Sequence, residues 1–154
     1  MIIRKATQKD AEGLARLFLQ FWEVHNNVDP VIKPKKKPTI KNQAETAKKD
    51  VRKKSKITLV AEEEEVIGFI QVDIKNNDDF FRMKKFAMLS ACVVDINHRK
   101  KGVAKQLTEE AVKEVKKRNV KYMKTECYNV NKDAMRAWEK LGFQKISTNL
   151  LRKL

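Results

Sequence analysis

The feature that most constrains the fold is an apolar run that leads directly into a polar loop and a glycine. Residues 85–95 include AMLSACVV, a stretch long and apolar enough for a strand buried on both faces of a sheet. A short, mostly polar loop follows, and Gly102 precedes apolar residues that recur at helical spacing. The sequence therefore predicts a central strand, a short loop and a helix that begins near Gly102, over residues 101–117.

The remaining patterns extend this unit into a mixed α/β (α+β) fold. Prolines 30, 34 and 38 interrupt residues 26–38, so we expect an open loop there. Thr7 and Asp10 have the spacing of a helix cap. The sequence predicts a mixed central sheet of about six strands with helices on both faces. The predicted strands are residues 2–6, 57–61, 66–74, 85–95, 121–128 and 143–154; the other predicted helices are 8–24, 39–54 and a short one that Asn131 caps and Gly142 ends.

Length and composition exclude several classes of protein. The 154 residues suit a single domain over 1–154. The sequence has no run of 18 apolar residues, so we expect no membrane span, and the first residues lack the apolar stretch of a secretion signal. Cys92 and Cys127 form no zinc pattern. We therefore expect a cytoplasmic protein with reduced thiols and no bound metal.

Positive charge is concentrated in one segment. The formal net charge is +15, and residues 30–56 contribute +9 of it. A basic surface attracts anionic partners such as nucleic acid, the ribosome, a phosphorylated cofactor or an acidic protein. The same composition is also that of a solvated, lysine-rich surface. The segment has no aromatic residue on which bases could stack, so we expect weak binding of nucleic acid at most.

The junction at Gly102 has the chemistry of an anion site. A helix N-terminus presents unpaired backbone N–H groups, and Gly102 and Ala104 let a phosphate approach the backbone closely. Arg99, Lys100, Lys101 and Lys105 add four positive charges around it. The residues match neither the nucleotide-binding P-loop nor the dinucleotide-binding glycine motif. An ordinary strand–helix junction with a basic surface remains the alternative.

Two motifs at suitable separation resemble the GNAT superfamily of acetyl-CoA-dependent N-acetyltransferases. The first is Arg99-x-x-Gly102-x-Ala104 after the apolar strand. The second is Asn131-x-x-Ala134 followed by WEKLGF at residues 138–143, where similar proteins have YEKxGF. The resemblance covers nearly the whole chain and is weakest over residues 27–56.

The resemblance implies a cofactor site for acetyl-CoA. In such proteins the central strand splays from its neighbour, so Cys92 and Val94, with Val93 between them, would pair with the pantetheine arm. Backbone N–H groups of residues 100–105 would hold the pyrophosphate. Asn131 would reach the pantetheine or phosphate side, and Ala134 would leave room for it. The residues implied to bind the cofactor are Cys92, Val93, Val94, Arg99, Lys100, Lys101, Gly102, Val103, Ala104, Lys105, Asn131 and Ala134.

The resemblance also implies direct attack of a neutral amine on the thioester through a tetrahedral intermediate. The backbone N–H of Val94 is the expected oxyanion donor. Trp138 occupies the position where many members have a tyrosine acid, and residues 86–91 offer no carboxylate base. Tyr128 is therefore the candidate replacement acid. His25, Asp73 and Glu126 are the candidate acceptor-site residues.

The sequence thus predicts transfer of an acetyl group from acetyl-CoA to a primary amine, above all a protein or peptide amine. A small amine, such as a polyamine or an amino-acid derivative, is the enzymatic alternative. A non-catalytic basic module that binds CoA or RNA on the same fold is the second alternative. A homodimer is a further arrangement that the sequence leaves open.

Overall fold

The apolar strand predicted from the sequence lies inside a mixed sheet in the computed structural model, which describes residues 1–25 and 28–154. The sheet has the order β1-β2-β3-β4-β5 over the described residues. The first four strands are antiparallel, and β5 is parallel to β4. The strands are β1 (Ile2–Lys5), β2 (Lys56–Glu62), β3 (Val66–Asn76), β4 (Lys85–Val94) and β5 (Met123–Thr125).

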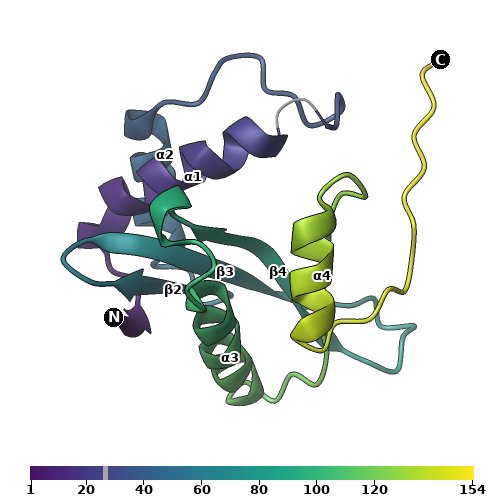
Figure 1. Cartoon of the computed structure of the whole chain (residues 1–154). Helices are drawn as coiled ribbons and strands as arrows, with labels where there is room; N and C mark the ends of the chain where they lie inside the picture. Colours follow the sequence, from purple (N-terminus) through teal and green to yellow (C-terminus); the bar gives the residue numbers. More distant parts are fainter. Residues whose placement is uncertain (26–27) are drawn as a thin grey trace.

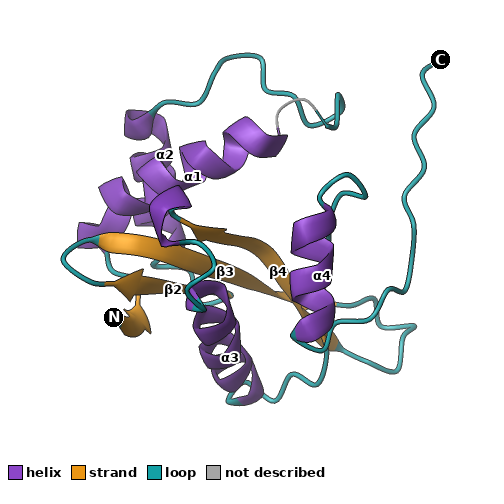
Figure 2. Ribbon diagram, in the orientation of Figure 1, coloured by secondary structure: helices purple, strands orange, loops and turns teal. Residues whose placement is uncertain are grey.

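Helices cover both faces of the sheet, as predicted (Figures 1 and 2). On one face lie α1 (Ala11–His25), which follows a 3-10 turn at Gln8–Asp10, and α2 (Ile40–Asp50). On the other face lie α3 (Val103–Lys116) and α4 (Lys132–Lys140). The α+β class expected from the sequence is confirmed. Each helix among the described residues is too short or too polar to cross a bilayer.

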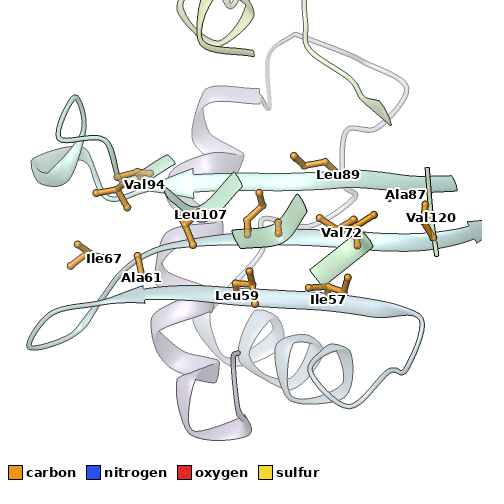
Figure 3. Close-up of a cluster of buried hydrophobic side chains, with 14 residues drawn as sticks. Ile57, Leu59, Ala61, Ile67, Val72, Ala87, Leu89, Val94, Leu107 and Val120 are labelled. Atoms are coloured by element: carbon orange, nitrogen blue, oxygen red, sulfur yellow. The ribbon is translucent and has the colours of Figure 1, made fainter. Parts of the chain in front are cut away.

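Alternating side chains of the strands build two cores. Leu107 of α3 packs with residues such as Leu59 and Val72 (Figure 3). Ala111 of α3 belongs to the same buried cluster. On the opposite face, the apolar stripe of α1 packs with two alanines of α2 against the sheet; the buried members include Leu14, Leu17, Ala44, Ala47, Val60, Phe69, Ala91 and Val93. A strand buried on both sides explains why the β4 sequence is almost continuously apolar.

An ion-pair cluster holds β1, the start of α1 and β2 together. The predicted cap is present, since the backbone N–H of Thr7 donates to Asp10 Oδ2 at 2.6 Å. The Arg4 guanidinium donates to both Asp10 oxygens at 2.7 and 2.9 Å and to Glu62 at 2.7 and 2.8 Å. These bonds favour the charged carboxylate, so the pKa of Asp10 is lowered to about 2.

The prediction of a final strand over residues 143–154 is wrong. Those residues form no strand, and after Phe143 the segment extends away from the sheet to the C-terminus (Figure 1). Ile146, Leu150 and Leu154 are exposed. The neighbouring strand β5 has only three residues, so it offers too short a row of backbone partners to order a twelve-residue segment. The sheet therefore has five strands over the described residues, one fewer than expected.

Candidate active site

The two central strands separate where a ligand can enter. β4 and β5 pair over three residues, from Ala87 with Met123 to Leu89 with Thr125. Ser90 then forms a bulge in β4, because Gln71 pairs with Ala91 while Val72 pairs with Leu89. Beyond the bulge, β4 continues to Val94 with only β3 as its described neighbour. One edge of the buried strand is therefore open.

Two amides of β4 face this open edge. The N–H of Asp95 donates to the Ile67 carbonyl at 2.9 Å, so Asp95 faces β3. Backbone groups alternate in direction along an antiparallel pair, which turns the N–H groups of Cys92 and Val94 away from β3. The Val94 carbonyl accepts a hydrogen bond from Arg99 Nε at 3.2 Å. An extended ligand can therefore pair with this edge as an added strand.

The loop after β4 presents a helix N-terminus. Gly102 has φ +80°, a conformation that glycine adopts without strain, and Lys100 has φ +62°, which costs a non-glycine residue about 1–2 kcal/mol. The first hydrogen bond of α3 joins the Gln106 N–H to the Gly102 carbonyl at 3.1 Å. The preceding three amides, those of residues 103–105, therefore project from the helix end. A Cβ at Gly102 would meet nothing within 4 Å, so the approach is open.

Four basic side chains and hydrogen bonds from a residue of α1 complete this end of the site. Arg99, Lys100, Lys101 and Lys105 are exposed around the helix end, as predicted. Gln20 of α1 holds the loop in place, because its amide donates to Asp95 Oδ2 at 2.9 Å and accepts from the Ile96 N–H at 3.3 Å.

This Asp95 carboxylate stays ionised. The Gln20 amide, then the Asn97 N–H and His98, lower its pKa. The sequence gave no signal for Gln20, which is one polar residue on an amphipathic helix.

A second part of the site is a small pocket between the end of α1 and the segment after β5. Its volume is about 180 Å³, and it is lined by His25, Val28, Tyr128, Val130 and Asn131. The rings of His25 and Tyr128 lie 5.6 Å apart. The Tyr128 hydroxyl donates to Asp29 Oδ2 at 3.4 Å. The fold thus brings together two predicted residues more than 100 positions apart, with Asp29, which the sequence did not single out.

Hydrogen bonding fixes the protonation pattern of His25. Its Nδ1 lies 2.7 Å from the Phe21 carbonyl, which can only accept, so Nδ1 carries a proton. When the ring is neutral, Nε2 holds the lone pair. No hydrogen-bond partner for Nε2 occurs in residues 1–25 and 28–154. Among the described residues, the Nε2 lone pair is therefore open to a hydrogen-bond donor.

Tyr128 is held in its neutral form. Burial raises the pKa of its phenol, and the negative charges of Asp29 and Glu126 raise it further. Asn131, in the same pocket lining, caps α4 by accepting from the Ala134 N–H at 3.1 Å. A neutral phenol is a proton donor, so the pocket combines a donor with an acceptor.

Other predicted residues lie away from this pocket or are already engaged. Asp73 pairs with Lys56 at 3.3 Å, and Lys56 also pairs with Asp50. Glu126 is exposed. Trp138 packs on Phe143, with ring centroids 5.3 Å apart, and on the α3-side core. Trp138 is therefore a packing residue.

Neither cysteine has the properties of a nucleophile. Cys92 and Cys127 are free thiols, and burial raises the pKa of Cys92 to about 12 and also raises that of Cys127. A thiol with such a pKa is almost wholly protonated near neutral pH. A larger hollow of about 620 Å³ lies over the Arg4–Asp10–Glu62 cluster, where the charged groups already satisfy one another.

The comparisons with known proteins agree with this geometry. The profile of the Acetyltransferase (GNAT) family matches residues 12–143. The chain belongs to the GNAT family. It is an acetyl-CoA-dependent N-acetyltransferase. No curated protein matches its sequence.

Several solved structures share the fold of this acetyltransferase. The tetramutant of the BH1408 protein from Bacillus halodurans is 23% identical, with 100% of each chain covered and a TM-score of 0.87. The aminoglycoside N-acetyltransferase AAC(6')-Iy in complex with CoA is 17% identical, covering 99% of this chain and 93% of that one, with a TM-score of 0.80. The aminoglycoside acetyltransferase meta-AAC0020, from an uncultured soil metagenomic sample and in complex with sisomicin, is 15% identical, covering 99% and 95%, with a TM-score of 0.73.

The residues of this acetyltransferase suit acetyl-CoA, its co-substrate. The open β4 edge offers backbone groups to an extended arm, and the uncrowded helix end with its four basic side chains offers donors to phosphates. When bound, acetyl-CoA supplies a thioester carbonyl, which an amine can attack. In residues 1–25 and 28–154 no group of three His, Cys, Asp or Glu residues could hold a metal.

Proposed function

We propose that this acetyltransferase acts on the terminal α-amine of a polypeptide, with His25 and Tyr128 as its proton-transfer residues. The observation that carries the proposal is the pocket in which His25, whose Nε2 has no hydrogen-bond partner in residues 1–25 and 28–154, faces the neutral Tyr128. The open β4 edge supports placement of the thioester nearby, because Tyr128 follows the strand that separates from β4.

Each residue has a distinct role in the proposed reaction. His25 Nε2 accepts a proton from the attacking amine, and the Phe21 carbonyl keeps the ring oriented through Nδ1. The Tyr128 hydroxyl donates a proton to the departing thiolate. The backbone N–H of Val94 at the open edge donates to the oxyanion, and the backbone N–H of Cys92 is the alternative donor. Asp29 attracts the ammonium form of the acceptor into the pocket.

The chemistry of amines favours an α-amine as acceptor. A peptide α-amine has a pKa of about 7.7–8.0, so roughly a tenth of it is neutral at pH 7, whereas a lysine amine at about 10.4 is neutral in only about one molecule in a few thousand. A single histidine is a modest base, and it suits the amine that is easier to deprotonate. A free polycationic acceptor is repelled by a chain of net charge +15.

The test is acetyl transfer from acetyl-CoA to synthetic peptides, monitored through the release of the CoA thiol. We expect turnover on a peptide with a free N-terminus and much slower turnover on the same peptide when its N-terminus is blocked and a lysine is present. Tyr128→Phe should lower kcat by roughly 10²–10⁴-fold, the usual range for a general acid or base, and so should His25→Ala. Binding of CoA should stay unchanged in both variants.

The chain contains a matched control for the tyrosine. Tyr122 is the other tyrosine, it is 62% exposed, and it lies outside the pocket. Tyr122→Phe should therefore keep full activity. Equal activity of Tyr128→Phe and wild type would overturn the assignment of the acid. Turnover on small amines with none on any peptide would overturn the proposed acceptor.

A further inference from the structure

The loop that contributes to the pocket wall carries positive charges that have no carboxylate partner among the described residues. The basic segment divides in two in the structure. Near the end of α2, Lys53 and Lys56 are paired with Asp50 at 2.7 and 3.0 Å. In the loop before α2, by contrast, four exposed lysines have no carboxylate within 4.0 Å among the described residues: Lys33, Lys35, Lys36 and Lys37.

These lysines belong to the same loop that forms the pocket wall. Val28 lines the pocket and Asp29 holds the Tyr128 hydroxyl. Lys33 follows Asp29 by only four residues, and Pro30, Pro34 and Pro38 each fix one backbone angle of the loop. The positive charge is therefore tethered to the pocket by a short, stiffened segment. Figure 1 shows this segment running from the end of α1 to the start of α2.

Exposed apolar side chains occur both in this loop and in the pocket lining. Val31 is 73% exposed, Ile32 is 48% exposed and Val130, which also lines the pocket, is 71% exposed. Exposed β-branched side chains beside a site indicate contact with a partner. Along the chain, Asp29 beside the pocket is followed by the exposed apolar pair Val31 and Ile32 and then by the four lysines.

We infer that the acceptor is an acidic polypeptide: its terminal amine enters the pocket, its first residues contact the exposed apolar side chains, and acidic side chains beyond them meet Lys33, Lys35, Lys36 and Lys37. This inference rests on the proposed function and names its substrate class. Charge complementarity of this kind raises association rates by about 10–10³-fold and weakens as salt is added. The loop lacks aromatic residues for base stacking, which disfavours single-stranded nucleic acid as the occupant.

The experiment compares three peptides in acetyl transfer at low and high salt. All three share one apolar N-terminal tripeptide, and a following block of four residues is Glu, Gln or Lys. We expect kcat/KM to be at least about tenfold higher for the Glu peptide than for the Gln peptide at low ionic strength. The preference should shrink strongly at about 0.3 M salt, where charges are screened. The Lys peptide should be the poorest substrate.

Two variants with equal loss of charge locate the effect. Lys35→Gln/Lys36→Gln/Lys37→Gln removes three charges from the loop. The control is Lys9→Gln/Lys75→Gln/Lys116→Gln, which removes three exposed charges elsewhere. The loop variant should lose the preference for the Glu peptide and retain its turnover of the Gln peptide. The control variant should retain the preference.

Each contrary outcome has a separate meaning. Acetylation of all three peptides at similar kcat/KM, or an equal loss in the control variant, overturns the acidic substrate class while the proposed function stands. Absence of transfer to every peptide overturns the proposed function itself. Competition by micromolar RNA at about 150 mM salt, abolished in the loop variant, overturns the inference in favour of a nucleic-acid partner.

Discussion

Substitution of Gly102 tests whether the start of α3 binds the phosphates of acetyl-CoA. The matched pair is Gly102→Glu and Gly102→Gln, which differ in charge and hardly in shape. A side chain here points into open space, since a Cβ meets nothing within 4 Å. The backbone angle of +80° costs either side chain about 1–2 kcal/mol of stability. Both variants should therefore be less stable than wild type by similar amounts.

Only the glutamate substitution should weaken the binding of CoA. One unit charge about 7 Å from a phosphate charge, at an effective dielectric constant of about 20, contributes about 2 kcal/mol of repulsion, which is roughly 30-fold in affinity. At a CoA concentration of about 100 times the wild-type Kd, ligand stabilisation is about 2.7 kcal/mol; a 30-fold weakening reduces it to about 0.9 kcal/mol. For a chain of this size, wild type should gain about 5–11 °C in Tm with CoA, and Gly102→Glu about a third of that.

The assay is thermal unfolding with and without CoA, read against each variant's own unliganded Tm. Because the gain is measured within each variant, the loss of intrinsic stability cancels. Gly102→Gln should keep most of the wild-type gain. A full gain in Gly102→Glu, or an equal loss in the glutamine variant, would refute the location of the phosphates at this helix end.

Two further predictions concern stability and thiol reactivity. Asp10→Asn should lower the free energy of unfolding by about 2 kcal/mol at pH 7, because Arg4 and Thr7 hold the folded-state pKa at about 2 against 3.8 in the unfolded chain. Because the folded-state pKa is lowered, the stabilisation is fully present at pH values above the unfolded-state pKa and is lost as the pH falls towards the folded-state pKa. In urea titrations, the difference in free energy of unfolding between wild type and variant should therefore shrink as pH falls from about 5 to 2. A difference that stays constant with pH would contradict this linkage. In a Cys127→Ser background at pH 8, folded Cys92 should react with iodoacetamide at least about 10³-fold slower than in urea, since burial raises its pKa from 9.0 to about 12. Equal rates would show an accessible thiolate.

Local patterns were sufficient to predict the central unit of the fold. The AMLSACVV run predicted a buried strand, and β4 ends within one residue of the predicted boundary. The helix after Gly102 and the cap at Thr7 and Asp10 also follow from short-range rules, because each depends on residues within one or two turns. The prediction of a final strand over residues 143–154 was wrong for the opposite reason. A strand is stabilised by hydrogen bonds to a neighbouring strand, and β5 is too short to provide them.

The phosphate site could be predicted from the sequence alone, since Arg99 through Lys105 are contiguous in the chain. The pocket proposed for the acceptor could not. The sequence singled out His25 and Tyr128 separately, but their 5.6 Å separation depends on how α1 and the segment after β5 pack around the sheet.

The residues that the sequence did not single out, Gln20 and Asp29, act through partners 75 and 99 positions away. Residue type and local spacing thus predicted most of the elements and a candidate anion site. Only the tertiary structure brought His25 next to Tyr128, because that proximity depends on long-range packing that leaves no periodic trace in the chain.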